Sequence, residues 1–402
     1  MINRTTFENM NYAGSAKGLL KILPAPPRGK KGWPWTTETD PRIYDRQSTF
    51  PKISIMTPSY NQGEFIEQTI RSVLLQNHPN FEYVIIDGGS TDKTFEIIKK
   101  YEPWIKYWVS EKDKGQSNAI NKGILKCDGD IFNWINSDDY YYPECFRILA
   151  ENFDLKKDHI VVGNYRFFDD AGERSERIID FRLRDSLEET IAYVLINQPS
   201  TFFRLDILKS LGELDERLSY VMDQDIWKKY LFRFGQNNIK ILDKDLTHFR
   251  FHSQSKTSQF YFNNEYISIF HSIALKAGMN KQADFIKRVY EKDVTDNFDF
   301  KYDFSKDEIR LAKKVINNFI YLKARNSYTS ENYDLLSSCL EIIETRWLNE
   351  KQKDYVLKLK VKSKLIKYKL SSVLKLISRK PKKDKPKKGS KSGTSLFKIL
   401  IT

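Results

Sequence analysis

The chain has 402 residues, of which 40% are hydrophobic and 30% charged, and its formal net charge at pH 7 is +14. This composition excludes a disordered or collagen-like chain and fits a folded protein of two or three domains. Three cysteines without a Cys-x-x-Cys pair argue against a disulfide framework and a cysteine zinc site. The N-terminal stretch lacks the apolar core of a secretory signal, and no run is long and apolar enough to span a bilayer, so we expect a cytoplasmic protein.

The positive charge is concentrated at the C-terminal end of the chain. Residues 351–402 hold 18 Lys and Arg and two acidic residues, which leaves 49 basic and 51 acidic residues in residues 1–350. An enzyme that binds nucleic acid in a basic groove should carry its positive charge on the folded domain. We therefore expect no nucleic-acid partner.

An irregular segment precedes an alternating pattern of strands and helices. Residues 1–50 are rich in Pro and Trp and predict a strap that packs on the next domain through Trp33 and Trp35. From residue 51, short β-branched runs alternate with helical stretches, which is typical of a parallel sheet with crossover helices. The expected strands are residues 53–56, 83–86, 107–109 and 131–135, and the expected helices are residues 64–76, 92–101 and 117–126.

The last third of the chain is expected to be helical. Ser305 and Glu308 have the spacing of a capping box at the start of a helix. Residues 361–378 place apolar side chains at helical spacing ahead of two lysine clusters, a pattern that predicts binding to an anionic membrane surface. In the alternative interpretation, this helix packs on the body of the protein and the lysine clusters form a solvated, disordered tail. The expected domains are a strap (1–50), an α/β domain (51–260), a helical region (261–350) and a basic amphipathic helix with a polybasic tail (351–402).

Polar and acidic residues follow each of the four expected strands. The loops read TPSYN (57–61), DGGSTD (87–92), SEKDKGQ (110–116) and NSDD (136–139). In an open parallel sheet, ligands bind outside the carboxyl ends of the strands. These loops contain neither the GxGxxG dinucleotide motif nor a Walker motif, which argues against ordinary NAD and P-loop ATP sites. The sequence thus predicts a ligand site of another kind at this edge.

Asp138 and Asp139 directly follow an apolar strand, where two carboxylates need a counter-charge. A divalent cation would supply it, and few oxygen ligands from the protein are typical of a Mg²⁺ or Mn²⁺ ion that arrives with a diphosphate. In the alternative interpretation, Asp139 only caps a helix that begins near Pro143.

The runs PSYN, DGGSTD, EKDKGQSNAINKG and NSDDYYYP, in this order, resemble the family 2 glycosyltransferases with the GT-A fold, particularly the bacterial enzymes of surface-polysaccharide assembly. The resemblance covers about residues 51–257. It implies an α/β fold with a Rossmann-like, mainly parallel central sheet followed by a helical region. It also implies transfer of a sugar from a nucleotide-diphospho-sugar, a UDP-sugar foremost, to a saccharide or lipid-linked acceptor, with Mn²⁺ or Mg²⁺ as cofactor. The enzyme would then lie on the inner face of the cell membrane.

The same resemblance assigns roles to single residues. Related transferases carry a segment similar to FRFHSQSKT that returns to the donor site, so His252 is a metal ligand in one interpretation and an ordinary surface or core histidine in the other. Nucleotide positions match Pro58, Tyr60, Asp87, Gln116 and Asp138, and metal positions match Asp139, Asp138 and His252.

A second acidic motif, MDQDIW at residues 222–227, supplies the expected general base. An inverting transfer needs a carboxylate that takes the proton of the acceptor hydroxyl. The match to the family's acidic doublet gives Asp223 this role, with Asp225 as the alternative. Either acid can instead serve only to favour the dipole of a helix N-terminus.

Two other classes of function compete with an inverting transferase. A sugar nucleotidyltransferase shares the sheet and the paired acids, but residues 58–63 lack the basic residue usual in its first loop. A catalytically inactive sugar- or nucleic-acid-binding protein on the same fold is the second alternative. The joint presence of Asp138, Asp139 and Asp223 argues against it.

Overall fold

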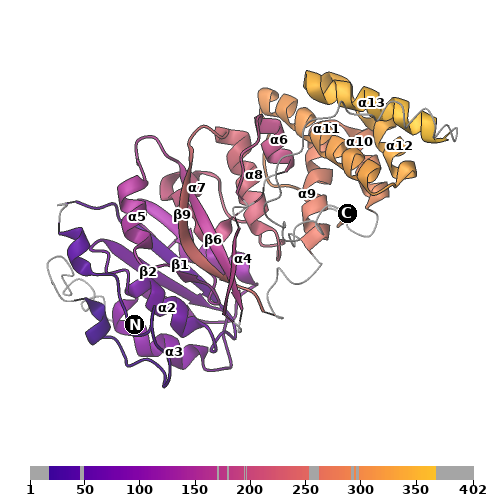
Figure 1. The fold of residues 1–402 in the computed structure, drawn as a ribbon. Helices are drawn as coiled ribbons and strands as arrows, with labels where there is room; N and C mark the ends of the chain where they lie inside the picture. The colour runs from indigo at the N-terminus through magenta and orange to yellow at the C-terminus, as the bar shows by residue number, and fades with distance from the viewer. Residues whose placement is uncertain are drawn as a thin grey trace. The chain divides into compact units, whose positions relative to one another are not determined.

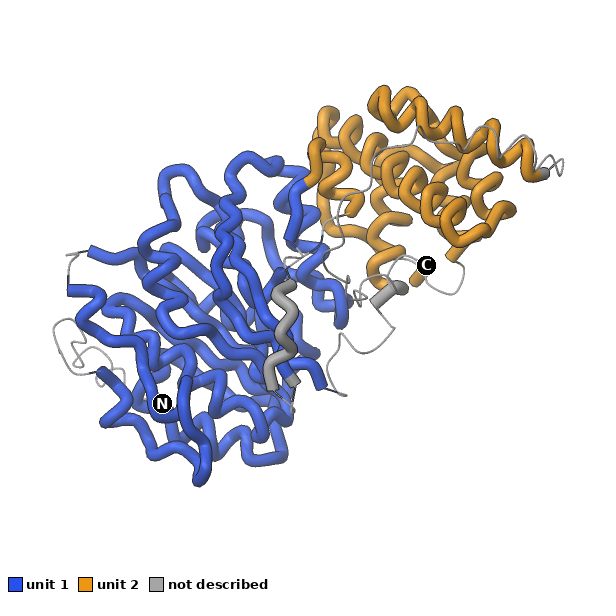
Figure 2. Tube along the Cα trace, viewed as in Figure 1, with its two compact units in different colours: residues 1–183, 195–262 blue, residues 184–194, 263–402 orange. Residues whose placement is uncertain are grey.

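The computed structural model describes residues 18–45, 49–169, 172–178, 181–193, 195, 197–252, 262–290, 294–295 and 298–367. The chain divides into two compact units, residues 1–183 with 195–262 and residues 184–194 with 263–402 (Figure 2). Residues 368–402, which hold most of the expected amphipathic stretch 361–378 and both lysine clusters, lie outside the described residues.

The first unit contains one mixed sheet, in which Figure 1 labels β1, β2, β6 and β9. In the described residues this sheet has nine strands in the order β3-β2-β1-β4-β8-β6-β9-β5, with β7 paired to β6. The strands β1 to β4 run parallel to one another, while β8 is antiparallel to β4 and β6. The bounds are β1 Ile53–Ser59, β2 Phe81–Asp87, β3 Tyr107–Ser110, β4 Ile131–Trp134, β5 Tyr140–Tyr141, β6 Ile160–Asp169, β7 Gly172–Ile178, β8 Thr201–Arg204 and β9 Ile239–Arg250.

Helices of the first unit connect these strands. Three 3₁₀ helices accompany its N-terminal segment and the β2–β3 connection, and a fourth precedes β8. The bounds are η1 Leu19–Lys21, η2 Pro41–Tyr44, α2 Ile66–Leu74, α3 Thr94–Tyr101, η3 Glu102–Trp104, α4 Gln116–Ile124, α5 Cys145–Asn152, η4 Gln198–Ser200, α7 Leu205–Ser210 and α8 Met222–Phe234.

The apolar runs of β1 and β4 are buried over their whole length, as expected for strands covered on both faces. Ile53 and Ile55 share a core cluster with Ile70 of α2. Met56 points to the other face, where it packs so closely on α4 that Gly123 has no room for a side chain. Helices therefore cover both faces of the parallel strands, and the expected strands and crossover helices are confirmed.

The N-terminal segment is held on the first unit by a buried arginine. The guanidinium of Arg71, in α2, donates to the carbonyl oxygens of Pro24, Pro34 and Trp35 at 2.8–3.0 Å. The indole N–H of Trp33 donates to the carbonyl of Tyr141 at 2.7 Å. Because a buried guanidinium with lost partners is costly, these contacts tie the segment to α2.

The second half of the sheet returns the chain to the parallel strands. β9 runs parallel to β6, with Arg250 opposite Phe168, and it pairs antiparallel with β5, with His248 opposite Tyr140. β5 follows the end of β4 after five residues. The end of β9 is thereby brought beside the loop that follows β4.

The second unit is helical in the described residues, as expected. The capping box of Ser305 and Glu308 is present at the start of α11. α13 packs on its neighbours through Val356 and Leu359, both 1% exposed. No described helix has the length and apolar character to cross a membrane. The bounds are α6 Leu187–Ala192, α9 Phe262–Lys276, α10 Asn280–Val289, α11 Lys306–Thr329, α12 Tyr333–Ile342, η6 Thr345–Trp347 and α13 Glu350–Lys367.

Candidate functional site

The sheet register brings the polar loops to one edge. Ser59 at the end of β1 lies opposite Asp87, and Asp87 lies opposite Ser110. β4 ends on the other side of β1, with Trp134 opposite Met56. The loops after four parallel strands therefore meet at the carboxyl edge of the sheet, the place at which open sheets bind ligands.

Asp87 organises the loop that follows β2. Its side chain is fully buried, and its carboxylate accepts hydrogen bonds from Ser90 N (2.9 Å), Ser90 Oγ (2.5 Å) and Ser110 Oγ (2.6 Å). Ionised carboxylates accept strong hydrogen bonds from such donors. Asp87 thus joins the ends of β2 and β3 and fixes the backbone of the DGGS loop.

The β1 loop is latched onto the DGGS loop beside it. The backbone N–H of Asn61 donates to Ser90 Oγ at 2.7 Å, and Asn61 Oδ1 accepts from the N–H of Thr91 at 2.9 Å. Pro58 is buried inside β1, whereas Tyr60 is 61% exposed. Of these two predicted nucleotide residues, only Tyr60 presents its side chain to solvent.

Gln116 connects the β3 and β4 loops. It is the first residue of α4, and its Nε2 donates to Asn136 Oδ1 at 2.8 Å. Ser117 and Asn121, further along the same helix, instead bind the chain before α8 through the carbonyls of Leu218 (2.6 Å) and Leu214 (3.0 Å). Gln116 therefore contacts the loop after β4, whereas Ser117 and Asn121 hold the segment that precedes α8.

Asp138 forms a pair with His252. The Nε2 atom of His252 lies 3.0 Å from Asp138 Oδ2, and the two side chains are 10% and 20% exposed. The ring of Phe65 packs against His252 with its centroid 5.0 Å away. The structure thus joins two of the predicted metal positions, which are 114 residues apart in the chain.

Asp139 is enclosed behind this pair. Its side chain is buried, Oδ1 accepts the backbone N–H of Arg250 at 2.9 Å, and Oδ2 has no hydrogen-bond partner in the described residues. Burial, followed by the negative charge of Asp138, raises the pKa of this carboxyl well above its usual range. The helix near Pro143 begins at Cys145 with Glu144 at its N-cap, so Asp139 does not cap it.

Arg250 fastens the aspartate loop to α2. Its Nε donates to the carbonyl of Asp138 at 3.0 Å, and its Nη2 donates to Gln68 Oε1 at 2.8 Å. The guanidinium lies between the rings of Phe65 and Phe168, 4.6 and 4.3 Å from their centroids. These contacts fix the position of the Asp138 backbone without using the carboxylate of Asp138.

The residues at this edge fit a divalent cation that is completed by other ligands. The described residues bring together no group of three or more His, Cys, Asp or Glu side chains able to hold a metal. The Asp138 and His252 pair offers one carboxylate and one imidazole, and Asp139 adds an orphaned buried oxygen. A Mn²⁺ ion accepts this mixture more readily than Mg²⁺, which prefers oxygen ligands.

The two acids of the MDQD motif lie in different environments. Both belong to the first turn of α8. Asp225 is fully buried and paired with Lys229 at 2.7 Å, whereas Asp223 is half-buried and accepts the N–H of Gln224 at 2.8 Å. An acid that meets an acceptor must reach solvent, and Asp223 satisfies this condition better than Asp225.

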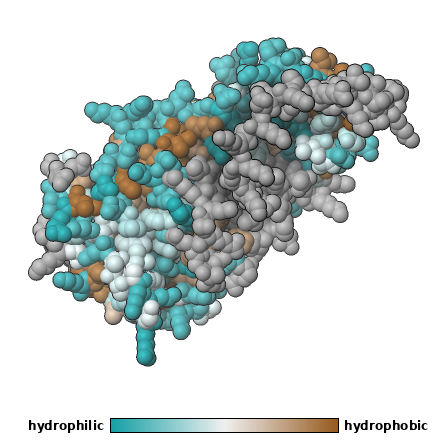
Figure 3. All heavy atoms as spheres, viewed as in Figure 1, coloured by the Kyte–Doolittle hydropathy of each residue, from teal (hydrophilic) through white to brown (hydrophobic). Residues whose placement is uncertain are grey.

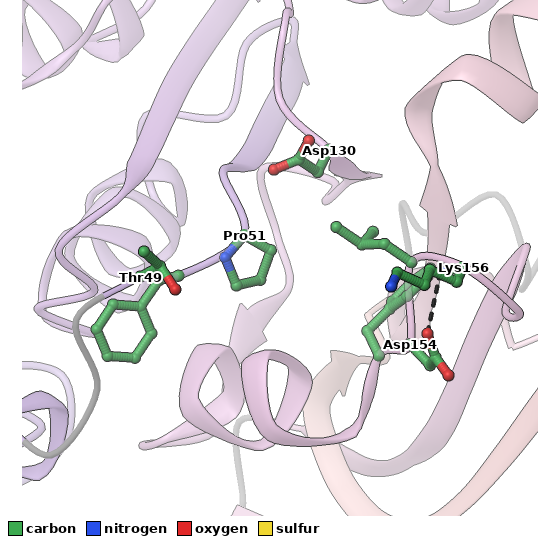
Figure 4. A pocket seen from close by; sticks show the side chains of 8 residues that line it. Thr49, Pro51, Asp130, Asp154 and Lys156 are labelled. Atoms are coloured by element: carbon green, nitrogen blue, oxygen red, sulfur yellow. Dashed lines mark hydrogen bonds between the residues drawn. The ribbon is translucent and has the colours of Figure 1, made fainter.

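A shallow hollow lies at the opposite end of the parallel strands. It has a volume of about 570 Å³ and is lined by Pro51, before β1, and Asp130, before β4, together with Asp154 and Lys156 (Figure 4). Its lining includes none of the predicted site residues. On the face drawn in Figure 3, hydrophilic side chains predominate and hydrophobic ones form small groups.

Two residues at the site were not singled out in the sequence. Asn136 meets Gln116 at the end of β4, and Asp113 lies against Gly88. Both stand in the polar loops that follow strands, and that position was the available signal. Their individual contacts depend on how neighbouring loops pack, which a single sequence does not reveal.

Comparison with known proteins follows the same part of the chain. Residues 54–212 match the family described as Glycosyl transferase family 2. An uncharacterized glycosyltransferase of Rickettsia typhi is 32% identical over 199 residues, which cover 46% of this chain and 61% of the relative. The putative teichuronic acid biosynthesis glycosyltransferase TuaG of Bacillus subtilis is 39% identical over 92 residues, which cover 22% of this chain and 36% of TuaG. The chain thus spans less than two thirds of these relatives.

A solved structure extends the likeness to the fold. The crystal structure of S. aureus TarS residues 1–349 in complex with UDP-GlcNAc is 18% identical in sequence, with a TM-score of 0.52. The likeness covers 78% of this chain and 88% of that one. This chain therefore shares a fold with a protein that was crystallised with UDP-GlcNAc.

Proposed function

We propose, from the membership of residues 54–212 in glycosyl transferase family 2, that this chain moves a sugar from a nucleotide-diphospho-sugar to a saccharide or lipid-linked saccharide acceptor. The observation that carries the proposal is the meeting of four polar loops at one sheet edge, with the Asp138 and His252 pair at one end. UDP-sugars are the first donors to test, because TarS was crystallised with UDP-GlcNAc.

The donor would lie across the carboxyl edge of the parallel strands. Tyr60 offers an exposed ring on which a nucleobase can stack, beside the loop that Asp87 fixes. The diphosphate would reach the loop after β4. Asp138 and His252 would hold a Mn²⁺ or Mg²⁺ ion there, and Arg250 would keep Asp138 in place. When bound, such a cation neutralises charge that develops on the leaving diphosphate.

Asp223 would act as the general base. The acceptor hydroxyl oxygen forms a bond to the anomeric carbon while the bond from that carbon to the diphosphate oxygen breaks. The hydroxyl proton passes to Asp223, and the electron pair leaves with the nucleoside diphosphate. Attack from the face opposite the leaving group inverts the anomeric configuration.

The acceptor class and the location are inferred from the name of a relative and from the distribution of charge along the chain. The name of TuaG refers to teichuronic acid biosynthesis, which favours a role in cell-surface polysaccharide synthesis. The basic residues from residue 351 onward favour a peripheral position on an anionic membrane surface.

The test is product analysis with purified full-length protein, Mn²⁺ or Mg²⁺, and a panel of UDP- and GDP-sugars. The proposal expects release of nucleoside diphosphate that depends on an added saccharide acceptor, and a glycoside of inverted configuration by NMR. Release of pyrophosphate from a nucleoside triphosphate and a sugar phosphate would instead identify a nucleotidyltransferase. Binding without turnover across donors and acceptors would favour an inactive relative.

A further inference from the structure

Asp113 occupies the space that a side chain on Gly88 would fill. A first side-chain carbon built on Gly88 would lie 2.9 Å from Asp113 Oδ2 and 3.2 Å from Oδ1. The N–H of Gly88 donates to the carbonyl of Ser59 at 2.8 Å, which fixes Gly88 beside the end of β1. The loop after β3 thus delivers a carboxylate to the base of the β1 and β2 loops.

One oxygen of Asp113 is already engaged and the other is available. Oδ1 accepts the N–H of Gly115 at 2.8 Å, and no hydrogen bond to Oδ2 occurs among the described residues. Gly115 has a φ of 109°, a conformation that side chains disfavour, so this turn requires glycine. The half-buried carboxylate is therefore oriented through Oδ1, and Oδ2 can accept a hydrogen bond from a ligand.

Asp87, the neighbouring acid, is less suited to meet a ligand. Its carboxylate already accepts three hydrogen bonds, and its side chain is fully buried. Tyr60, on the adjacent loop, is exposed and provides an aromatic face. Gly88 binds the carbonyl of Ser59, the residue before Tyr60, and lies against Asp113, so the Tyr60 ring and the Asp113 carboxylate belong to loops that meet at Gly88.

We infer that Asp113 Oδ2 accepts the imino N–H of the donor's nucleobase and selects uracil over cytosine; this inference rests on the function proposed above. Uracil carries a hydrogen on N3, whereas cytosine carries a lone pair there, which a carboxylate repels. Oδ1 can accept a second hydrogen bond beside that of Gly115, so Asp113 distinguishes uracil from cytosine and not from guanine. Asp113 is in this account a specificity-determining residue.

Calorimetric titration of the full-length protein with UDP, CDP and GDP in the presence of Mn²⁺ tests the inference. The wild type should bind UDP at least roughly tenfold more tightly than CDP, because loss of a charged hydrogen bond costs about that much or more. Asp113→Asn should weaken UDP binding roughly tenfold. It should also reduce the ratio of UDP affinity to CDP affinity, because an amide can donate a hydrogen bond to N3 of cytosine. Glu111→Gln, in the same loop but paired with Lys122 at 2.8 Å, is the matched control and should leave the preference unchanged.

A second variant tests the position of the carboxylate. Gly88→Asp combined with Asp113→Gly moves the acid to the neighbouring backbone position and should restore the UDP preference that Asp113→Gly alone loses. If Asp113→Asn and Asp113→Gly bind UDP and CDP with the wild-type ratio, the inference is overturned and the proposed function stands. If the wild type binds no nucleoside diphosphate, both are overturned.

Discussion

Replacement of Lys228 by methionine should make the stability of the protein less dependent on pH. Lys228 lies in α8 with its side chain fully buried, and its Nζ donates to Gln224 Oε1 at 2.7 Å. Burial lowers the pKa of this ammonium group to about 7, although the carboxylates of Asp223 and Asp225 oppose the shift. In the unfolded chain the same group titrates near its ordinary value, about 10.4.

The sign of the effect follows from proton binding. Between the two pKa values the unfolded chain holds a proton on Lys228 that the native state has released, so the free energy of unfolding rises with pH. From pH 7 to pH 9 this group alone contributes a rise of about 2 kcal/mol. Lys228→Met removes that contribution and should stabilise the fold at pH 7 by up to about 4 kcal/mol, the free energy that corresponds at this pH to a lysine pKa lowered from about 10.4 to about 7.

Urea denaturation at pH 7, 8 and 9 measures the difference, since other titrating groups affect both proteins alike. Lys229→Met is the matched control, because Lys229 is equally buried but paired with Asp225 at 2.7 Å. It should destabilise the protein by about 3–5 kcal/mol by leaving a buried carboxylate without its counter-charge. Parallel curves of stability against pH for the wild type and Lys228→Met would show that Lys228 does not have a lowered pKa in the folded protein.

Three further outcomes are expected. Asp223→Asn should lower kcat at least a hundredfold with little change in donor affinity, because the amide keeps its shape but cannot take a proton; normal kcat in steady-state assays would exclude this base. Arg250→Met should cost about 2–4 kcal/mol of stability in denaturant titrations and raise the Mn²⁺ concentration needed for activity. An unchanged Mn²⁺ requirement would show that Arg250 does not position Asp138. Full-length protein should sediment with vesicles of phosphatidylglycerol and phosphatidylcholine and be released at high salt, whereas protein ending at Lys367 should stay in the supernatant. Equal sedimentation of the two proteins would show that residues 368–402 do not bind the membrane.

The end point of that truncation is set by the structure. The basic region was expected to begin at residue 351, but α13 runs over Glu350–Lys367 and buries Val356 and Leu359. A cut at residue 350 would remove a packed helix as well as the basic tail. A cut after Lys367 leaves α13 intact and removes 11 Lys and Arg and one Asp.

The parallel half of the sheet was predictable because its signals are local. Buried parallel strands are continuous apolar runs, and the polar loops that follow β1 to β4 stand out against them. The register then brings those loops together without further information. The strands β6, β8 and β9 pair through contacts between distant parts of the chain, and their order within the sheet could not be derived from the sequence.

Site residues were predictable by type more than by role. Asp138 and Asp139 are identical neighbours in the sequence, yet one faces His252 and the other is enclosed by Arg250 and Thr69. Asp223 and Asp225 differ in the same way, because one turn of α8 directs only the latter into the core. Burial decides these roles, and burial arises from contacts with distant segments.

A crystal structure of the full-length protein with UDP and Mn²⁺ would locate the donor site. We expect the uracil beside Tyr60 and Asp113, and the diphosphate at the pair formed by Asp138 and His252. Density for the nucleotide in the hollow between Pro51 and Asp130, or a diphosphate remote from Asp138, would contradict this expectation.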